Sequence, residues 1–206
     1  ATLTDAKLGV MKDISEVKAV GHRVLHGGSR FSGSVRVDGA VKEAIKECIP
    51  LGPLHNPANL KGIEAFEELL PGVPQVAVFD TAFHQTMPDY AYMYALPYKY
   101  YEEDGIRRYG FHGTSHRFVS ARCIELLGSP EHSKIVSCHL GNGSSISAVV
   151  DGKCLDTTMG LTPLEGIMMG TRCGSIDPAI VTTLMKKYNL TPDEMDTVMN
   201  KKSGML

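Results

Sequence analysis

Residues 135–156, which read IVSCHLGNGSSISAVVDGKCLD, constrain the fold more than any other part of the chain. Two apolar runs are separated by a glycine-rich turn at 141–145, and Asp151-Gly152, a dipeptide typical of tight hairpins, leads into a third extended piece at 153–156. The pattern predicts three consecutive strands. The first turn would expose backbone N–H groups and short serine hydroxyls, as a phosphate site requires. An ordinary glycine-rich hairpin explains that turn equally well when it is taken alone.

The bulk composition narrows the class of protein. The 206 residues are 43% hydrophobic and carry a net charge of −2, so electrostatics give no reason to expect a nucleic acid or an anionic membrane as partner. No apolar run approaches the roughly 18 residues of a membrane span. Five scattered cysteines without a CxxC pair favour reduced thiols over a disulfide frame or a zinc site. We therefore expect a cytoplasmic protein.

Helical and strand patterns alternate along the chain, which predicts the α/β class. In the first part we expect strands near 17–20 and 23–25, flanking Gly21-His22, and a helix over 39–49. A second helix should begin with Asn56 as its N-cap and Pro57 in its first turn.

The later part continues the alternation. A buried strand at 74–80 should be followed by an irregular connection at 86–108. Thr114 or Ser115 should cap a helix that ends near Gly128. Residues 157–174 read as a loop, and two helices should follow, the first capped by Asp177 and the second by the capping box of Thr191 and Glu194.

Six polar residues are candidates for a functional site: Arg23, Asp80, His112, His139, Asn142 and Arg172. An arginine fork suits a carboxylate or phosphate, although an ordinary surface ion pair is the commoner fate of a single arginine. Asp80 ends a predicted strand, where α/β proteins place their sites, although it could also cap the next segment. His112 precedes a helix N-terminus and could donate to an anion there.

Several enzyme classes are disfavoured. His112 and His116 have the i, i+4 spacing of a zinc helix, but the glutamate of HExxH is missing. Neither a GxSxG elbow nor a Walker GxxxxGK[ST] motif is present. Two arginines and a glycine turn suit phosphoryl transfer to a small anionic acceptor.

Six segments carry a family resemblance: VGHRVLHGG, LGPLHNPANLKGI, VFDTAFHQTMP, RRYGFHGTSHRFV, HLGNGSSISAV and TMGLTPLEGIMMGTRCGSIDP. Together they resemble the acetate kinase (acetokinase) family, which is grouped with actin, sugar kinases and heat-shock ATPases. The resemblance implies two ribonuclease-H-like domains that close over ATP, incomplete in this chain. It also implies a homodimer when full length, using Mg²⁺ and ATP to convert acetate reversibly into acetyl phosphate and ADP.

The resemblance also implies residue roles. Arg23 and Arg172 should hold the acetate carboxylate and the phosphoryl group in transfer, Asp80 should orient Arg23 and the magnesium-bound assembly, and His112 should stabilise the transition state together with Arg172. The residues that should contact the terminal phosphates of the nucleotide are His139, Leu140, Gly141, Asn142 and Gly143. Those that should line the acetate methyl pocket are Leu25, Leu54, Phe111 and Pro163.

The resemblance leaves some points open. Family members are about twice as long, and the expected metal ligands would lie outside these residues. Residues 1–82 should belong to the first domain and 83–206 to the second, so we expect no kinase activity from this chain alone. Valine is usual where Leu25 stands, and the extra methylene should favour acetate over propionate. Propionate kinase, or a fragment that binds nucleotide without catalysis, are the alternatives, and the physiological direction and phosphoryl donor stay undecided.

Overall fold

A computed structural model describes residues 2–53 and 55–205. The chain divides into two compact units, Ala1–Phe79 and Asp80–Leu206, and each is described by itself. The assignment of residues 1–82 and 83–206 to the two domains of the family stays a prediction.

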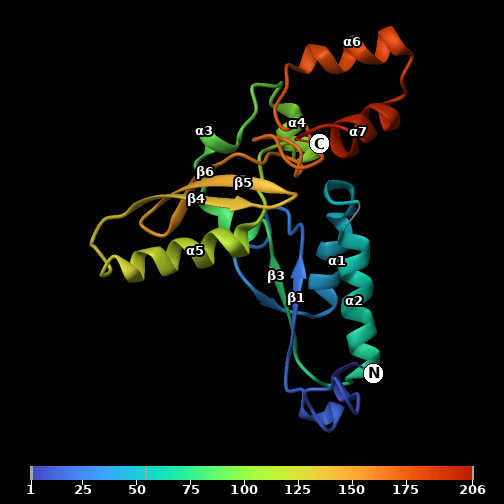
Figure 1. Ribbon diagram of the computed structural model, residues 1–206, viewed down its shortest axis with the longest axis vertical. Helices are drawn as coiled ribbons and strands as arrows, with labels where there is room; N and C mark the ends of the chain where they lie inside the picture. Colours follow the sequence, from blue (N-terminus) through green and yellow to red (C-terminus); the bar gives the residue numbers. More distant parts are fainter. Residues whose placement is uncertain (1, 54, 206) are drawn as a thin grey trace. The chain divides into compact units, whose positions relative to one another are not determined.

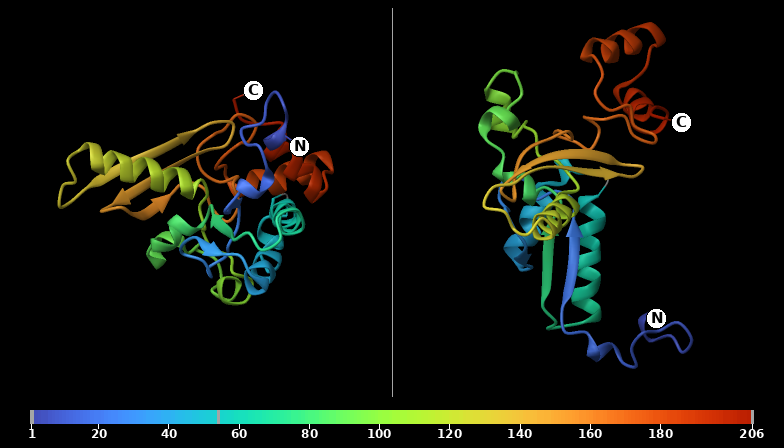
Figure 2. Two further views of the ribbon diagram at one scale, coloured as in Figure 1. Left: turned by 90° about the horizontal axis from the view of Figure 1, so that it is seen from below. Right: turned by 60° about the vertical axis from the view of Figure 1, so that its left-hand side comes forward.

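The first unit is a small mixed sheet with two helices. Its strand order is β1 (Val20–Val24), β3 (Gln75–Phe79), β2 (Val35–Arg36), with β1 parallel and β2 antiparallel to β3. Helices α1 (Gly39–Glu47) and α2 (Asn56–Leu69) pack together, and α2 lies along the sheet beside β1 (Figures 1 and 2). The buried core includes Val24, Ile45, Ile63, Ala77 and Phe79. Short 3-10 turns complete the unit at Thr2–Thr4, Ile14–Glu16 and Ile49–Leu51.

Two local predictions in this unit are wrong. Gly21 and His22 do not separate two strands, because one continuous register pairs all of β1 with β3. Asn56 is the first residue of α2 and His55 occupies the N-cap position. The Asn56 amide is used elsewhere: its Oδ1 accepts from the backbone N of His26 at 3.1 Å, and its Nδ2 donates to the carbonyls of His26 and Ile45 at 3.0 and 3.1 Å.

The second unit is built on the predicted three-strand meander. Strands β4 (Lys134–Leu140), β5 (Ser144–Val150) and β6 (Lys153–Thr157) are antiparallel neighbours in that order. Asp151 and Gly152 both have positive φ angles, of 49° and 77°, which confirms the tight Asp-Gly turn. Helix α5 (Gly113–Leu126) packs against β4 (Figure 1).

The remaining elements of the second unit are short. The 3-10 turn Ala82–Thr86 follows Asp80, and the connection at 86–108, predicted to be irregular, contains α3 (Asp89–Tyr92) and α4 (Lys99–Asp104). Helices α6 (Pro178–Tyr188) and α7 (Pro192–Lys201) contact each other after the loop at 157–174.

The predicted caps of these last two helices are confirmed. The Asp177 carboxylate accepts from the backbone N of Ala179 at 2.9 Å, at the start of α6. Thr191 and Glu194 form the capping box at the start of α7. All five cysteines are free thiols, and within the described residues no helix is long and apolar enough to cross a membrane.

Candidate functional site

The start of α5 is fixed by Asp80, a carboxylate only 2% exposed to solvent. His112, the N-cap residue, donates its backbone N–H to Oδ2 of Asp80 at 3.1 Å, and Gly113 donates its own to the Asp80 carbonyl at 2.9 Å. A Cβ at Gly113 would overlap that carbonyl, so a glycine is needed for this close approach. The helix therefore begins before Thr114 and Ser115, and the prediction that either of them caps it is wrong.

Two donor groups meet at the glycine-rich turn between β4 and β5. A Cβ built on Gly143 would lie 3.2 and 3.4 Å from the guanidinium nitrogens of Arg172 and 3.4 Å from Nε2 of His112. The Arg172 guanidinium is held from behind, because its Nη1 donates to the Pro163 carbonyl at 2.7 Å. A cation, an imidazole nitrogen and bare backbone thus converge on one small space, which suits an anion with several oxygens.

The serines of the turn point inward, contrary to the prediction that their hydroxyls are exposed. Ser144 and Ser145 are both buried, and the Ser144 hydroxyl donates to the Gly141 carbonyl at 2.8 Å. Backbone groups and the exposed Asn142 are what the turn offers to a ligand. Gly170 donates its N–H to the Asn142 carbonyl at 3.2 Å, which brings the loop at 157–174 against the turn.

Behind His112 lies a chain of buried hydrogen bonds. Oγ of Ser145 is 2.8 Å from Nδ1 of His112 and 2.7 Å from Nε2 of His116. Nδ1 of His116 is in turn 3.0 Å from Oγ of Ser137. On its other side, the His112 ring stacks on His139, with 3.9 Å between ring centroids and 19° between planes.

Burial sets the charge of the surrounding groups. It lowers the pKa of His116 to about 3, with the neighbouring histidines adding to the effect, and it lowers the pKa of His84 to about 4. Both rings are therefore neutral at pH 7. Burial also lowers the pKa of Arg172, but an arginine stays protonated at neutral pH. Arg172 is therefore cationic, whereas His84 and His116 are neutral.

The predicted site residues of the second unit do not all lie together. His112, Arg172 and Gly143 meet, while the Leu140 side chain is 72% exposed. Phe111 is fully buried, and its carbonyl lies 3.0 Å from Nε2 of His84. Groups of three or more potential metal ligands are absent from residues 2–53 and 55–205.

The predicted residues of the first unit are described separately. Arg23 is an exposed residue of β1, and Leu25, just beyond that strand, is 3% exposed. Leu54 lies outside the described residues. The expected pairing of Arg23 with Asp80 therefore stays a prediction.

Sequence reasoning missed the roles of His116, Ser137 and Ser145. The i, i+4 spacing of His112 and His116 does place the two rings together, at 6.5 Å between centroids, but around a serine hydroxyl. The sequence signal was the alternation of serines along the strands. Ser145 and Ser147 fall on one face of β5, where Ser137 of β4 pairs with Ser147.

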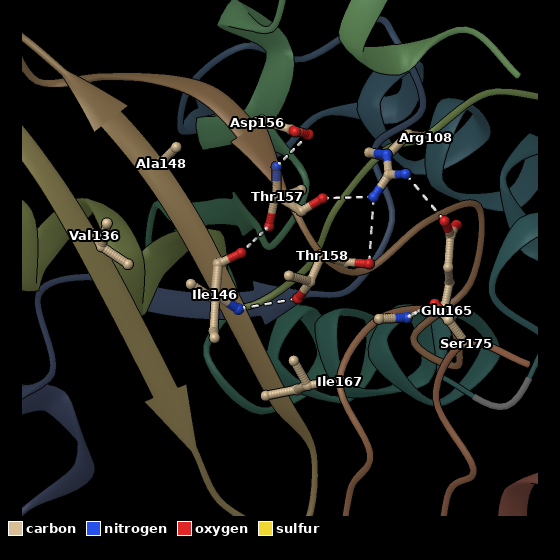
Figure 3. A pocket seen from close by; sticks show the side chains of 11 residues that line it. Arg108, Val136, Ile146, Ala148, Asp156, Thr157, Thr158, Glu165, Ile167 and Ser175 are labelled. Carbon is tan, nitrogen blue, oxygen red and sulfur yellow. Dashed lines mark hydrogen bonds and ion pairs between the residues drawn. The ribbon is translucent and has the colours of Figure 1, made fainter.

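The opposite face of this sheet is apolar and borders a separate hollow of about 510 Å³ (Figure 3). Val136, Ile146 and Ala148 line the hollow from the strands. At its polar margin Arg108 donates to Glu165 at 3.0 Å and to the Thr157 carbonyl. Neither His112 nor Arg172 lines this hollow, so it is not the predicted site.

Comparison with known proteins agrees with this geometry. The family model described as the acetokinase family matches residues 2–206. The chain belongs to the acetokinase family. The resemblance inferred from the six segments is therefore confirmed. An acetate kinase of Methanosarcina acetivorans is 63% identical over 205 residues, which are 99% of this chain and 50% of that relative.

Solved structures of the family have the same fold. An acetate kinase from Porphyromonas gingivalis superposes with a TM-score of 0.94 at 54% identity, over 98% of this chain and 51% of that one. A propionate kinase from Francisella tularensis gives a TM-score of 0.90 at 50% identity, over 93% and 50% of the respective chains. The α/β class is confirmed, and the chain spans about half the length of the relatives it matches.

Proposed function

We propose that the full-length protein is an ATP-dependent acetate kinase. One oxygen of the acetate carboxylate forms a bond to the γ-phosphorus of ATP as the bond to the β,γ-bridging oxygen breaks, giving acetyl phosphate and ADP. The observation that carries this proposal is the convergence of the Arg172 guanidinium and His112 Nε2 on Gly143. In this family, such a group of donors suits the equatorial oxygens of a phosphoryl group in flight.

We assign different residues of the second unit to different roles in binding the phosphates. Arg172 supplies a fixed positive charge, which the Pro163 carbonyl holds in place. His112 supplies a donor at Nε2, and Asp80 holds the backbone that carries this ring. We assign the terminal phosphates of the nucleotide to His139 and to the turn that follows it, residues 140–143. Magnesium, when bound with ATP, would neutralise phosphate charge. We assign it no ligand among the described residues.

The acceptor is assigned from the family pattern. Arg23 would bind the acetate carboxylate, and its methyl group would lie among the apolar residues Leu25, Leu54, Phe111 and Pro163. Direct transfer is favoured over an enzyme-bound phosphoryl group, because two arginines around the acceptor suit an in-line reaction. Propionate kinase is the second candidate, because a propionate kinase is among the matching structures. A fragment that binds nucleotide without turnover is the third.

Trapping the product as a hydroxamate tests the proposal. The full-length protein with ATP and Mg²⁺ should form acyl phosphate from acetate with a higher kcat/KM than from propionate. The 206-residue chain assayed beside it should give no turnover, because it spans half the length of its relatives. A higher kcat/KM for propionate would favour the second candidate, and no product from either acid would refute both. We also infer from the family a cytoplasmic homodimer.

A further inference from the structure

Ser145 occupies a position that the phosphate-binding role of its turn does not explain. Its side chain is fully buried, and its hydroxyl contacts two imidazole nitrogens, Nδ1 of His112 at 2.8 Å and Nε2 of His116 at 2.7 Å. Ser137 contacts His116 and Ser115 contacts His139, whereas among the described contacts Ser145 is the serine that touches His112, the histidine whose Nε2 faces Gly143 and Arg172.

The number of available hydrogen atoms restricts the donor and acceptor roles in this series of hydrogen bonds. A serine hydroxyl has one hydrogen, so Ser145 donates to one of its two imidazole partners and can accept from the other. His116 is neutral, because its burial disfavours the charged ring, and a neutral imidazole has one donor and one acceptor nitrogen. No third partner of the Ser145 hydroxyl is among the described bonds, so its hydrogen goes to one of the two imidazoles, and the three bonds from Ser137 to His112 then all run in the same direction.

Only one of the two directions suits a neutral His112 beside an anion. If Ser137 donates to Nδ1 of His116, then Nε2–H of His116 donates to Ser145, and Ser145 donates to Nδ1 of His112. The proton of His112 then lies on Nε2, where it can donate toward the space shared with Arg172. In the reverse direction a neutral His112 would present a bare lone pair to the anion, which is repulsive.

We propose that Ser145 is a positioning residue that holds the His112 ring in the tautomer with its proton on Nε2. This inference rests on the proposed phosphoryl transfer. His116 and Ser137 continue this series of hydrogen bonds into the protein interior. Their donor and acceptor roles determine to which imidazole the Ser145 hydroxyl donates. Two further groups contact His112: the His139 ring, stacked on it, and Asp80, which accepts from its backbone. Neither contacts Nδ1 of His112 in the described bonds.

The wild-type protein gives the first test. With ¹⁵N-labelled histidine in the full-length protein, the His112 signals are assigned by their loss in His112→Gln. At a pH where this ring is neutral, we expect Nδ1 to be the unprotonated nitrogen and Nε2 the protonated one. The opposite tautomer would overturn the inference without any need for a stable serine variant.

Ser145→Ala gives the second test, with Ser147→Ala as its matched control. Ser147 is also fully buried on β5, but its hydroxyl bonds to Oγ1 of Thr157 at 2.8 Å and, among the described contacts, touches no histidine. We expect Ser145→Ala to lower kcat about 10- to 100-fold, as a misplaced catalytic group does, with the KM for ATP changed little. Ser145→Thr, which restores a hydroxyl, should recover part of the rate.

The outcomes separate this inference from the proposed function. If the wild-type protein makes no acetyl phosphate, the proposed function fails. If it does, but Ser145→Ala and Ser147→Ala have equal kcat and unchanged His112 signals, the positioning role alone is refuted. If Ser145→Ala does not fold, Ser137→Ala is used instead, because it removes the hydroxyl at the far end of this series of hydrogen bonds. A loss of the His112 tautomer preference is expected in Ser137→Ala as well.

Discussion

The backbone of His112 has φ of 60° and ψ of 24°, a left-handed conformation that side chains other than glycine seldom adopt. Such a conformation costs energy and persists only when its surroundings hold it. Here Asp80 binds the backbone, Ser145 binds Nδ1 and His139 stacks on the ring. The consequence at the residue scale is that Nε2 is aimed at Gly143 and Arg172 rather than left to rotate.

The proposed acetate pocket provides a prediction at the same scale. Leu25→Val should raise the ratio of kcat/KM for propionate to that for acetate, because one methylene in an apolar pocket changes discrimination by about 1–3 kcal/mol at most. Leu69→Val is the control, since Leu69 is an exposed residue at the end of α2. A ratio that is the same in wild type and Leu25→Val would remove Leu25 from the pocket.

At the scale of elements, the placement of α5 depends on one backbone contact. Gly113→Ala should destabilise the fold by at least about 1–3 kcal/mol, because its Cβ would overlap the Asp80 carbonyl. Gly62→Ala, within α2, has open space around the added carbon and should stabilise by about 0.5–1 kcal/mol. Urea unfolding of both variants measures this contrast. Equal stability of the two variants would contradict the proposed close approach.

Elements were predictable from sequence where their signals are local. The Asp151-Gly152 turn, the Asp177 cap and the Thr191 capping box depend on neighbouring residues, and all three are confirmed. The start of α5 was not predictable, because it depends on a contact with Asp80, 33 positions before Gly113. Likewise, Asn56 has the composition of a cap, but the distant backbone of His26 and Ile45 uses its side chain.

The candidate site, too, could be predicted from sequence only in part. Arg172, His112 and the glycine turn could be selected as candidates because their residue types suit a phosphate. Strand register and the fold of α5 decide which serine reaches which imidazole, so the inward direction of Ser145 could not be predicted.

At the scale of the whole molecule, both units bury neutral histidines, which should make the fold sensitive to acid. Burial lowers the pKa of His26 in the first unit to about 4, and that of His84 and His116 in the second to about 4 and about 3. Below about pH 6.5 these histidines are protonated in the unfolded chain but remain neutral in the folded chain. Stability is therefore fully present above that pH and declines as the pH falls toward 4.

Urea unfolding midpoints at pH 7.5 and pH 5.0 measure this decline. Each buried histidine can add up to about 1.4 kcal/mol per pH unit to the pH dependence of the free energy of unfolding. His116→Gln keeps an uncharged polar side chain and should reduce the difference between the two midpoints. His132→Gln should not, because the His132 side chain is 83% exposed. An equal midpoint at both pH values would contradict the assignment of these rings as neutral and buried.

We propose that Arg172 meets the phosphoryl group in transfer, and the decisive measurement is kcat for acetyl phosphate formation by Arg172→Ala in the full-length protein. We predict a fall of about 10²- to 10³-fold, as when one fixed donor to a transition state is lost. The thermal midpoint should stay near the wild-type value, and Arg122→Ala, which removes an arginine paired with Glu125 on α5, should leave kcat unchanged. A kcat within twofold of wild type for Arg172→Ala would contradict the claim.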